Sequence, residues 1–145
     1  MRPALVPELI VSDIVSSLSV YTGVFGFRVL YERPEERFAF LERERAQLML
    51  EQPLAHDRLW PRATFERPFG RGVNLQIEVS DAAELHQTVE ASGLELVLPP
   101  EERWYRRGVE EVGNRQFAVA DPDGYVLRFF QDLGARPRIS TPSSA

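Results

Sequence analysis

The chain of 145 residues has no cysteine, no lysine and only two histidines, and all 17 of its basic residues are arginine. Without cysteine, the protein can form no disulfide, no thiolate nucleophile and no cysteine-bound zinc or iron–sulfur site. Without lysine, it has no side-chain amine for Schiff-base chemistry. His56 and His86 are separated by far more than the one helical turn of a two-histidine metal helix. Several common catalytic chemistries are therefore excluded.

Long hydrophobic runs and a clustered basic segment are also missing. No apolar run approaches the roughly 18 residues of a membrane-spanning helix, so we expect no membrane association. The first residues lack the pattern of a secretory signal, which predicts a cytoplasmic protein. The net charge of −5 disfavours binding to nucleic acid, because that function needs a concentrated basic face. With 43% hydrophobic residues, the chain is predicted to fold as one domain.

The chain contains an internal repeat. The tripeptide Val-Ser-Asp occurs at 11–13 and again at 79–81, an offset of 68 residues. A strand-like run precedes each copy, and an apolar pattern with helical spacing follows it. The serine and aspartate of each copy can cap a helix, which Gly26 or Gly93 then ends. The predicted helices cover 14–25 and 82–91, after predicted strands at 5–11 and 73–79.

Each helix is followed by three strand-like segments, so both halves are predicted to be β-α-β-β-β modules. Asp-Pro-Asp-Gly at 121–124 predicts a turn between the last two strands. The predicted strands are 27–31, 37–41 and 47–51 in the first half, and 94–98, 115–120 and 125–130 in the second. We predict a single domain over 1–131, with modules at 4–52 and 72–131, a linker at 53–71 and a loose tail at 132–145.

Two phrases of the sequence resemble a known superfamily. They are VPELIVSDIVSSLSVYTGVFGF at 6–27 and NRQFAVADPDGYVLRFF at 114–130. Both are similar to the vicinal oxygen chelate superfamily, which includes glyoxalase I, extradiol dioxygenases and bleomycin resistance proteins. The resemblance covers about residues 4–131. It implies an α+β fold in which the curled mixed sheets of two paired β-α-β-β-β modules enclose a cavity.

Strand alternation predicts which side chains face that cavity. Side chains two residues apart in a strand share a face, and the apolar set in each strand belongs with the helix. In 73–79 the odd-numbered residues are apolar, so the even-numbered ones are left for the cavity. The predicted cavity-facing residues are Val6, Glu8, Ile10, Gln47, Met49, Glu51, Asn74, Gln76, Glu78, Val126, Arg128 and Phe130.

The metal enzymes of the superfamily place their ligands at four of these positions. In this sequence the four positions carry Val6, Met49, Asn74 and Arg128. Valine and arginine cannot bind a divalent cation, methionine binds only soft metals, and asparagine offers one weak oxygen ligand. Arginine also adds a positive charge where the metal would lie. The resemblance therefore implies a protein without a metal or another cofactor.

One metal site remains possible if the ligand positions are shifted by two residues along the strands. This shift brings Glu8 and Gln76, which also lie 68 residues apart, to equivalent positions near Glu51. Glutamate and glutamine serve as ligands in some glyoxalases. The alternative function is then a metal-dependent lyase, isomerase or dioxygenase of the same superfamily. A third reading is a cavity-containing protein whose partner is another protein.

The bleomycin resistance branch is the nearer resemblance. Its members share Val-Pro at the start of the first strand and Arg-x-Phe-Ala before the last turn, here Val6-Pro7 and Arg115–Ala118. Pro7 cannot donate a ladder hydrogen bond, which fits either an edge strand or an arm exchanged with a partner subunit. Members of this branch sequester drugs. A homodimer that binds a small aromatic molecule, such as a cationic antibiotic, is therefore favoured over an enzyme.

Aromatic residues are the expected contacts for such a ligand. Phe38 falls near an aromatic residue that the resistance proteins use in their drug cleft, and of Phe38 and Phe40 we expect one in the core and one in the cavity. A second aromatic of that cleft falls on Gly113, so Trp104, in a long charged loop, is expected to replace it as a lid. Trp60 either contacts the ligand or caps the linker.

Arg128 has two readings. An ion pair with Glu8, Glu51 or Glu78 is favoured over binding of an anionic ligand, because an unpaired buried charge is costly. The predicted ligand-binding residues are Phe38, Met49, Glu51, Trp60, Asn74, Gln76, Glu78, Trp104 and Arg128.

Overall fold

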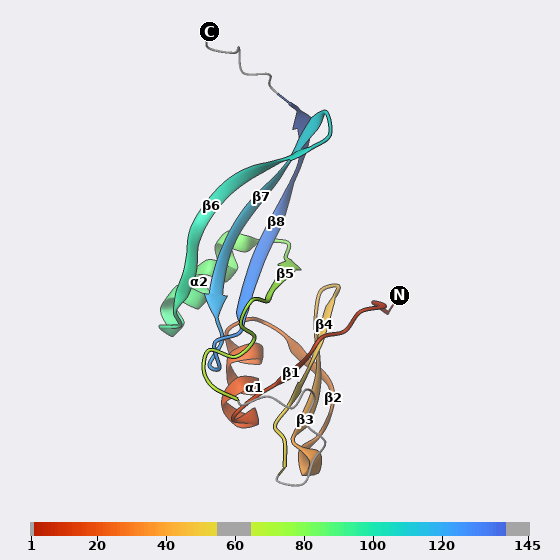
Figure 1. The fold of residues 1–145 in the computed structure, drawn as a ribbon, viewed down its shortest axis with the longest axis vertical. Coiled ribbons are helices and arrows are strands. Elements are labelled where there is room, and N and C mark those ends of the chain that lie inside the picture. Colours follow the sequence, from red (N-terminus) through yellow and green to blue (C-terminus); the bar gives the residue numbers. More distant parts are fainter. Residues whose placement is uncertain (1, 55–64, 139–145) are drawn as a thin grey trace.

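The computed structural model describes residues 2–54 and 65–138, which form two modules with the same order of elements (Figure 1). The α+β fold of two β-α-β-β-β modules is therefore confirmed. The first module consists of β1 (Glu8–Ile10), α1 (Ile14–Gly23), β2 (Arg28–Arg33), the short 3-10 helix η1 (Pro34–Glu36), β3 (Phe38–Arg43) and β4 (Ala46–Glu51). The second consists of β5 (Asn74–Glu78), α2 (Ala82–Ser92), β6 (Leu96–Arg107), β7 (Glu110–Ala120) and β8 (Val126–Pro137).

Each module folds into its own mixed sheet of four strands. The strand orders are β1-β4-β3-β2 and β5-β8-β7-β6, with one parallel pair at the start of each order and antiparallel pairs elsewhere. The carbonyl of Pro7 accepts a hydrogen bond from Met49 N of the same chain at 2.9 Å, and β1 lies at a sheet edge, where proline is tolerated. Neither sheet closes, and the enclosed cavity stays a prediction.

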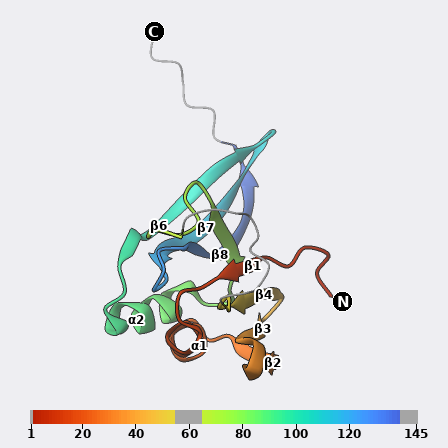
Figure 2. The ribbon, with the colours of Figure 1, turned by 60° about the horizontal axis from the view of Figure 1, so that its bottom comes forward.

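Helices α1 and α2 begin at the two Val-Ser-Asp copies and lie side by side (Figure 2). The Asp13 carboxylate accepts hydrogen bonds from the Val15 and Ser16 amides, and Asp81 accepts one from Glu84 N. Gly93 ends α2 with φ 78°, as predicted, whereas α1 ends at Gly23, before Gly26. Among the described residues, no helix is long and apolar enough to cross a membrane.

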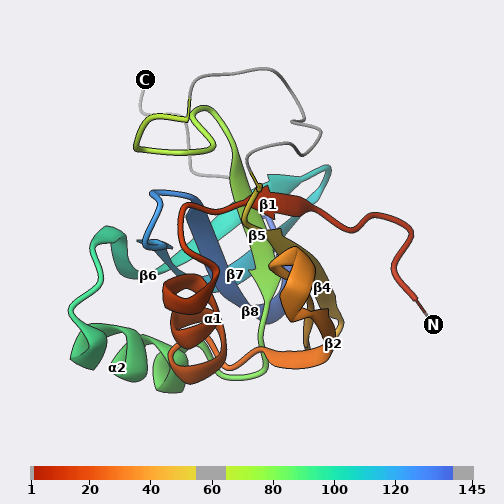
Figure 3. The same ribbon diagram turned by 90° about the horizontal axis from the view of Figure 1, so that it is seen from below.

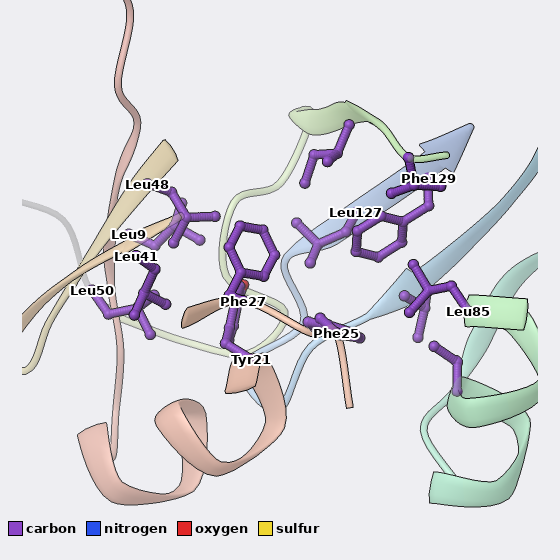
Figure 4. Close-up of a cluster of buried hydrophobic side chains, with 14 of the residues drawn as sticks. Leu9, Tyr21, Phe25, Phe27, Leu41, Leu48, Leu50, Leu85, Leu127 and Phe129 are labelled. Atoms are coloured by element: carbon purple, nitrogen blue, oxygen red, sulfur yellow. The ribbon is translucent and has the colours of Figure 1, made fainter. Parts of the chain in front are cut away.

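One hydrophobic core spans both modules. Tyr21, Phe25 and Phe27 lie between leucines of the first sheet and Leu127 and Phe129 of the second (Figure 4). The Phe25 and Phe129 ring centroids are 5.4 Å apart, and all five side chains are at most 3% exposed. Burial of large aromatic side chains from both halves stabilises the two modules as one unit.

Reciprocal polar contacts cross the junction between the modules. Ser12 N and Oγ donate to the Asp123 carboxylate in the β7–β8 turn. Ser80 N, in the second copy of the tripeptide, donates to Glu44 Oε2 in the β3–β4 turn at 3.1 Å. Each repeated serine is thus bound by the hairpin turn of the other module. Figure 3 shows α1 and α2 side by side from below.

The second sheet is longer than the sequence predicted. Strands β6, β7 and β8 have 12, 11 and 12 residues, whereas β2, β3 and β4 have 6 each, and the long strands project away from the helices (Figure 1). The predicted loop at 99–114 is mostly hairpin, and the predicted loose tail is strand as far as Pro137; both predictions were wrong there. The projecting part is polar on both faces, so it has no apolar alternation to reveal a strand.

Candidate functional site

The first sheet carries a row of aromatic side chains on the face opposite α1. Phe40 on β3 is paired with Tyr31 on β2 and with Met49 on β4. The Tyr31 and Phe40 rings are stacked, with centroids 5.1 Å apart and planes 14° apart. Phe38 lies two residues earlier on β3 and shares this face, which we call the aromatic face (Tyr31, Phe38, Phe40 and Met49).

Phe38 and Phe40 are both on this face, so the expectation that they point to opposite faces of the sheet was wrong; both side chains are buried. The residues between and after them, Ala39 and Leu41, are the ones that join the core. Phe38 is nevertheless only 6% exposed, because the Arg33 guanidinium lies over its ring at 4.0 Å from the centroid. Glu51 is paired with Phe38 at the border of the aromatic face.

The second sheet carries polar side chains on the face opposite α2. Arg128 on the central strand β8 is paired with Gln76 on β5 and with Ala118 on β7. An Arg128 terminal nitrogen donates to Gln76 Oε1. Asn74 and Glu78 on β5 share this face, and so do their apolar partners on β8, Val126 and Phe130. We define the polar face as Asn74, Gln76, Glu78, Tyr105, Gln116 and Arg128.

The predicted ion pair of Arg128 is not formed. Within residues 2–54 and 65–138 no carboxylate lies within ion-pair distance of Arg128, and Glu78 pairs with Arg45 from the β3–β4 hairpin instead. Arg128 Nε is buried and has no hydrogen-bond partner among these residues. Arg128 therefore presents a cation to the polar face without an ion-pair partner in the described part of the chain.

The sequence did not reveal the contact between Gln116 and Tyr105. Gln116 is 2% exposed, and its Nε2 donates to Glu101 Oε1 at 2.9 Å and to Tyr105 OH at 2.7 Å. Its Oε1 has no partner in the described chain. Recognition of β6 as a strand would have identified Tyr105, because alternation places it on the face of its cross-strand neighbours.

Trp104 lies on the other face of the second sheet. Its strand partner is Gly113, and a Cβ at position 113 would be 2.7 Å from the indole ring, so the ring fills the space of a side chain there. The Arg136 guanidinium covers the ring at 3.8 Å from its centroid. Trp104 thus replaces a side chain at 113, but the structure does not bring it to Gln116 and Arg128. Trp60 lies outside the described residues.

The four positions implied for metal ligands do not fit a divalent cation. Met49 is paired with Glu8 and Phe40, and Arg128 contacts Gln76, so a positive charge stands beside the amide. Within the described ranges, no group of three or more His, Cys, Asp or Glu side chains is arranged to hold a metal. The register-shifted alternative places Glu8 on the first sheet and Gln76 on the second, against the Arg128 cation.

Two open pockets lie at equivalent positions in the two modules, away from the centres of both faces. One pocket has a volume of about 450 Å³ and lies beside Val79 and Ser80, with Glu78 at its border. The other has about 400 Å³ and lies beside Val11 and Ser12. Phe38, Met49, Gln76 and Arg128 line neither pocket.

The buried ionisable groups belong to the module junction. Tyr21 OH donates to Asp121 Oδ2 at 2.8 Å, and Tyr125 OH donates to Ile10 O at 2.8 Å. Burial raises the pKa of the Asp121 carboxyl, and burial together with the nearby carboxylates raises the pKa of Tyr125 to about 12. Burial also raises the Tyr21 pKa. These groups connect the modules and lie on neither face.

Comparison with known proteins agrees with this architecture. The sequence profile of the glyoxalase/bleomycin resistance protein/dioxygenase superfamily matches residues 5–129. The chain belongs to this superfamily. A bleomycin resistance protein from Geobacillus stearothermophilus is 28% identical over 140 residues, with 88% of this chain and 96% of that protein covered. A bleomycin resistance protein from Staphylococcus aureus matches with the same values.

Two solved structures show the same fold. TioX from Micromonospora sp. ML1 is 23% identical and has a TM-score of 0.67, with 90% of this chain and 100% of TioX covered. A lactoylglutathione lyase from Agrobacterium tumefaciens is 17% identical and has a TM-score of 0.58, with coverages of 90% and 95%. At these identities the likeness concerns the fold alone, so the function must be argued from the two faces.

Proposed function

We propose that the protein binds a small aromatic molecule and sequesters it without chemical conversion. The observation that supports this most directly is the aromatic face, where Tyr31 is stacked on Phe40 and is still 49% exposed. A planar ligand stacked on such a ring gains on the order of 1–3 kcal/mol per ring. The relatives at 28% identity are named for bleomycin resistance, which fits a ligand of this kind.

The charge around the aromatic face favours a ligand with a cationic group. Glu8 and Glu51 border this face through their pairing with Met49 and Phe38, and the chain carries a net charge of −5. Carboxylates next to aromatic rings attract cations electrostatically. A cationic aromatic antibiotic, such as a bleomycin-type glycopeptide, is therefore our first candidate.

In this proposal, a second copy of the chain forms the second wall of the site, on the side of the ligand away from the aromatic face. Each sheet leaves one face uncovered by its helix, and a ligand on one face alone would remain half in water. A homodimer that sets the aromatic face of one copy opposite the polar face of its partner would exclude water from both sides. Exchange of the β1 arm or of whole modules would produce this pairing.

The test is calorimetric titration of the purified protein with a bleomycin-type glycopeptide. We expect saturable binding of about one drug per chain, and a loss of about 5- to 150-fold in affinity for Tyr31→Ala, which corresponds to the energy of one stacked ring. Phe65→Ala is the matched control, because Phe65 is a similarly exposed aromatic (38%) away from this face. An equal loss in both variants, or no saturable binding, contradicts the proposal.

A further inference from the structure

The polar face has unsatisfied hydrogen-bonding capacity that the fold does not explain. Buried polar side-chain atoms in folded proteins nearly always have a partner. In the described part of the chain, four buried side-chain atoms have none: Ser17 Oγ, Gln47 Oε1, Gln116 Oε1 and Arg128 Nε. Two of these four, the donor Arg128 Nε and the acceptor Gln116 Oε1, lie on the polar face.

Arg128 is held in place although none of the carboxylates that the structure describes forms an ion pair with it. It projects from β8, the strand between β5 and β7, and Gln76 Oε1 accepts a hydrogen bond from one terminal nitrogen. Its neighbour on β7 is Ala118, whose side chain offers no polar group to the guanidinium. By contrast, the rim arginines Arg28 and Arg45 are paired with Glu42 and Glu78.

We infer that Arg128 recognises a carboxylate on the ligand. This inference rests on the proposed function, because it concerns the same aromatic ligand with a cationic group and adds a carboxylate to that ligand. A guanidinium presents two parallel N–H donors that match the two oxygens of a carboxylate. The ligand's carboxylate supplies the missing charge, and a donor beside it, such as a hydroxyl or an amide N–H, would satisfy Gln116 Oε1.

The surroundings of Arg128 favour a single negative charge over a phosphate dianion. Glu78 and Glu101 also lie on or beside this face, where Glu101 accepts a hydrogen bond from Gln116. Because Glu78 is paired with Arg45, Arg128 can pair with one negative charge on the ligand, whereas the second charge of a dianion would be repelled by the neighbouring carboxylates. An amino acid-like ligand would place its carboxylate toward Arg128 and its amine toward Glu8 at the border of the aromatic face.

The experiment compares 2-naphthoate with 2-naphthamide, which have the same rings and differ in charge. Dissociation constants are measured by NMR titration for the wild-type protein, Arg128→Gln and Arg45→Gln. We expect the wild type to bind the carboxylate at least about 10-fold more tightly than the amide, as a charge-assisted hydrogen bond implies. Arg128→Gln should lose this preference. Arg45→Gln removes an arginine that is paired with Glu78 and should keep it.

Each outcome decides between the two proposals. Equal affinities for both probes in the wild type overturn the role of Arg128 and leave the aromatic site standing, whereas binding of neither probe overturns both. A preference that survives in Arg128→Gln also overturns the inference. If Arg128→Gln weakens self-association but leaves the preference unchanged, then Arg128 pairs with a carboxylate of the second copy and not with the ligand. Should Arg128→Gln fail to fold, Arg128→Lys replaces it, with a smaller preference expected because the two-pronged donor is lost.

Discussion

Replacing Asp121 by alanine should lower the free energy of unfolding by about 3–5 kcal/mol, as expected when buried partners of a lost carboxylate are left unsatisfied. The side chain is 3% exposed and accepts three hydrogen bonds: one from Tyr21 OH at 2.8 Å, and two from the Asp123 and Tyr125 amides, each at 2.9 Å. An unsatisfied buried donor costs about 1–3 kcal/mol, and partial relaxation of the turn keeps the total below the sum of three.

The assay is urea unfolding of the wild type, Asp121→Ala, Asp121→Asn and the control Asp132→Ala. Asp132 is exposed and accepts one hydrogen bond, from Gly134 N at 2.8 Å, so its loss should cost about 1 kcal/mol or less. Asp121→Asn keeps an acceptor for the two amides and should cost less than alanine. A loss below about 1 kcal/mol for Asp121→Ala would refute the reasoning, because three orphaned donors would then have found new partners.

The pH dependence gives a second check on Asp121. Burial raises the pKa of Asp121 above its ordinary value of 3.8, so the folded state holds the proton more tightly than the unfolded state does. The stability that this proton contributes is fully present below the unfolded pKa and is lost as the pH rises through the folded pKa. Relative to Asp121→Asn, the wild type should therefore gain stability as the pH falls from 7 toward 4. A constant difference across this range would contradict the burial effect.

The remaining predictions concern packing, metal content and assembly. Gly113→Val should destabilise the protein by about 1–3 kcal/mol in thermal melts, because a Cβ at position 113 meets the Trp104 ring at 2.7 Å. The control Gly23→Ala, whose Cβ meets nothing within 4 Å, should be neutral or stabilising. Elemental analysis of the purified protein should find no stoichiometric nickel, zinc, manganese or iron; a metal whose removal abolishes an activity would support the enzyme alternative. Light scattering should give twice the chain mass of 16.6 kDa, and a monomer at micromolar concentration would remove the second wall of the proposed site.

Local signals in the sequence were sufficient to predict the order of the elements, whereas the pairing of the two modules was implied by the resemblance to the superfamily. The repeated Val-Ser-Asp marks both helix starts because each aspartate is a side-chain cap, and the apolar alternation of 73–79 correctly assigned Ile77 to the core. The long hairpin was missed because its strands are stabilised by cross-strand ion pairs rather than by an apolar face. Arg115 pairs with Glu102, and Arg136 pairs with Glu111. In the sequence alone, these residues appear only as charged segments, which do not indicate strands.

The sequence predicted that several candidate residues share a face of a sheet, but it did not predict which side chains contact one another. Alternation placed Gln76 and Arg128 together, and the structure pairs them directly. Strand alternation could not show that Glu78 forms an ion pair with Arg45, since that contact joins residues 33 positions apart in different modules. Assigning Phe38 and Phe40 to different faces overlooked the two-residue period of a strand, and placing Trp104 over the cavity overlooked its pairing with Gly113.

The crossed contacts of Ser12 and Ser80 have a consequence for any attempt to divide the chain. Each module carries a serine whose partner belongs to the other module, Asp123 for Ser12 and Glu44 for Ser80. Two fragments cut in the linker would each expose an unbound serine amide and one side of the shared aromatic core. Because the two contacts are related by the repeat, two copies of a single module could bind one another through this surface. The duplicated chain thus has the internal organisation of a fused dimer, and fragment complementation should restore the whole only when both halves are present.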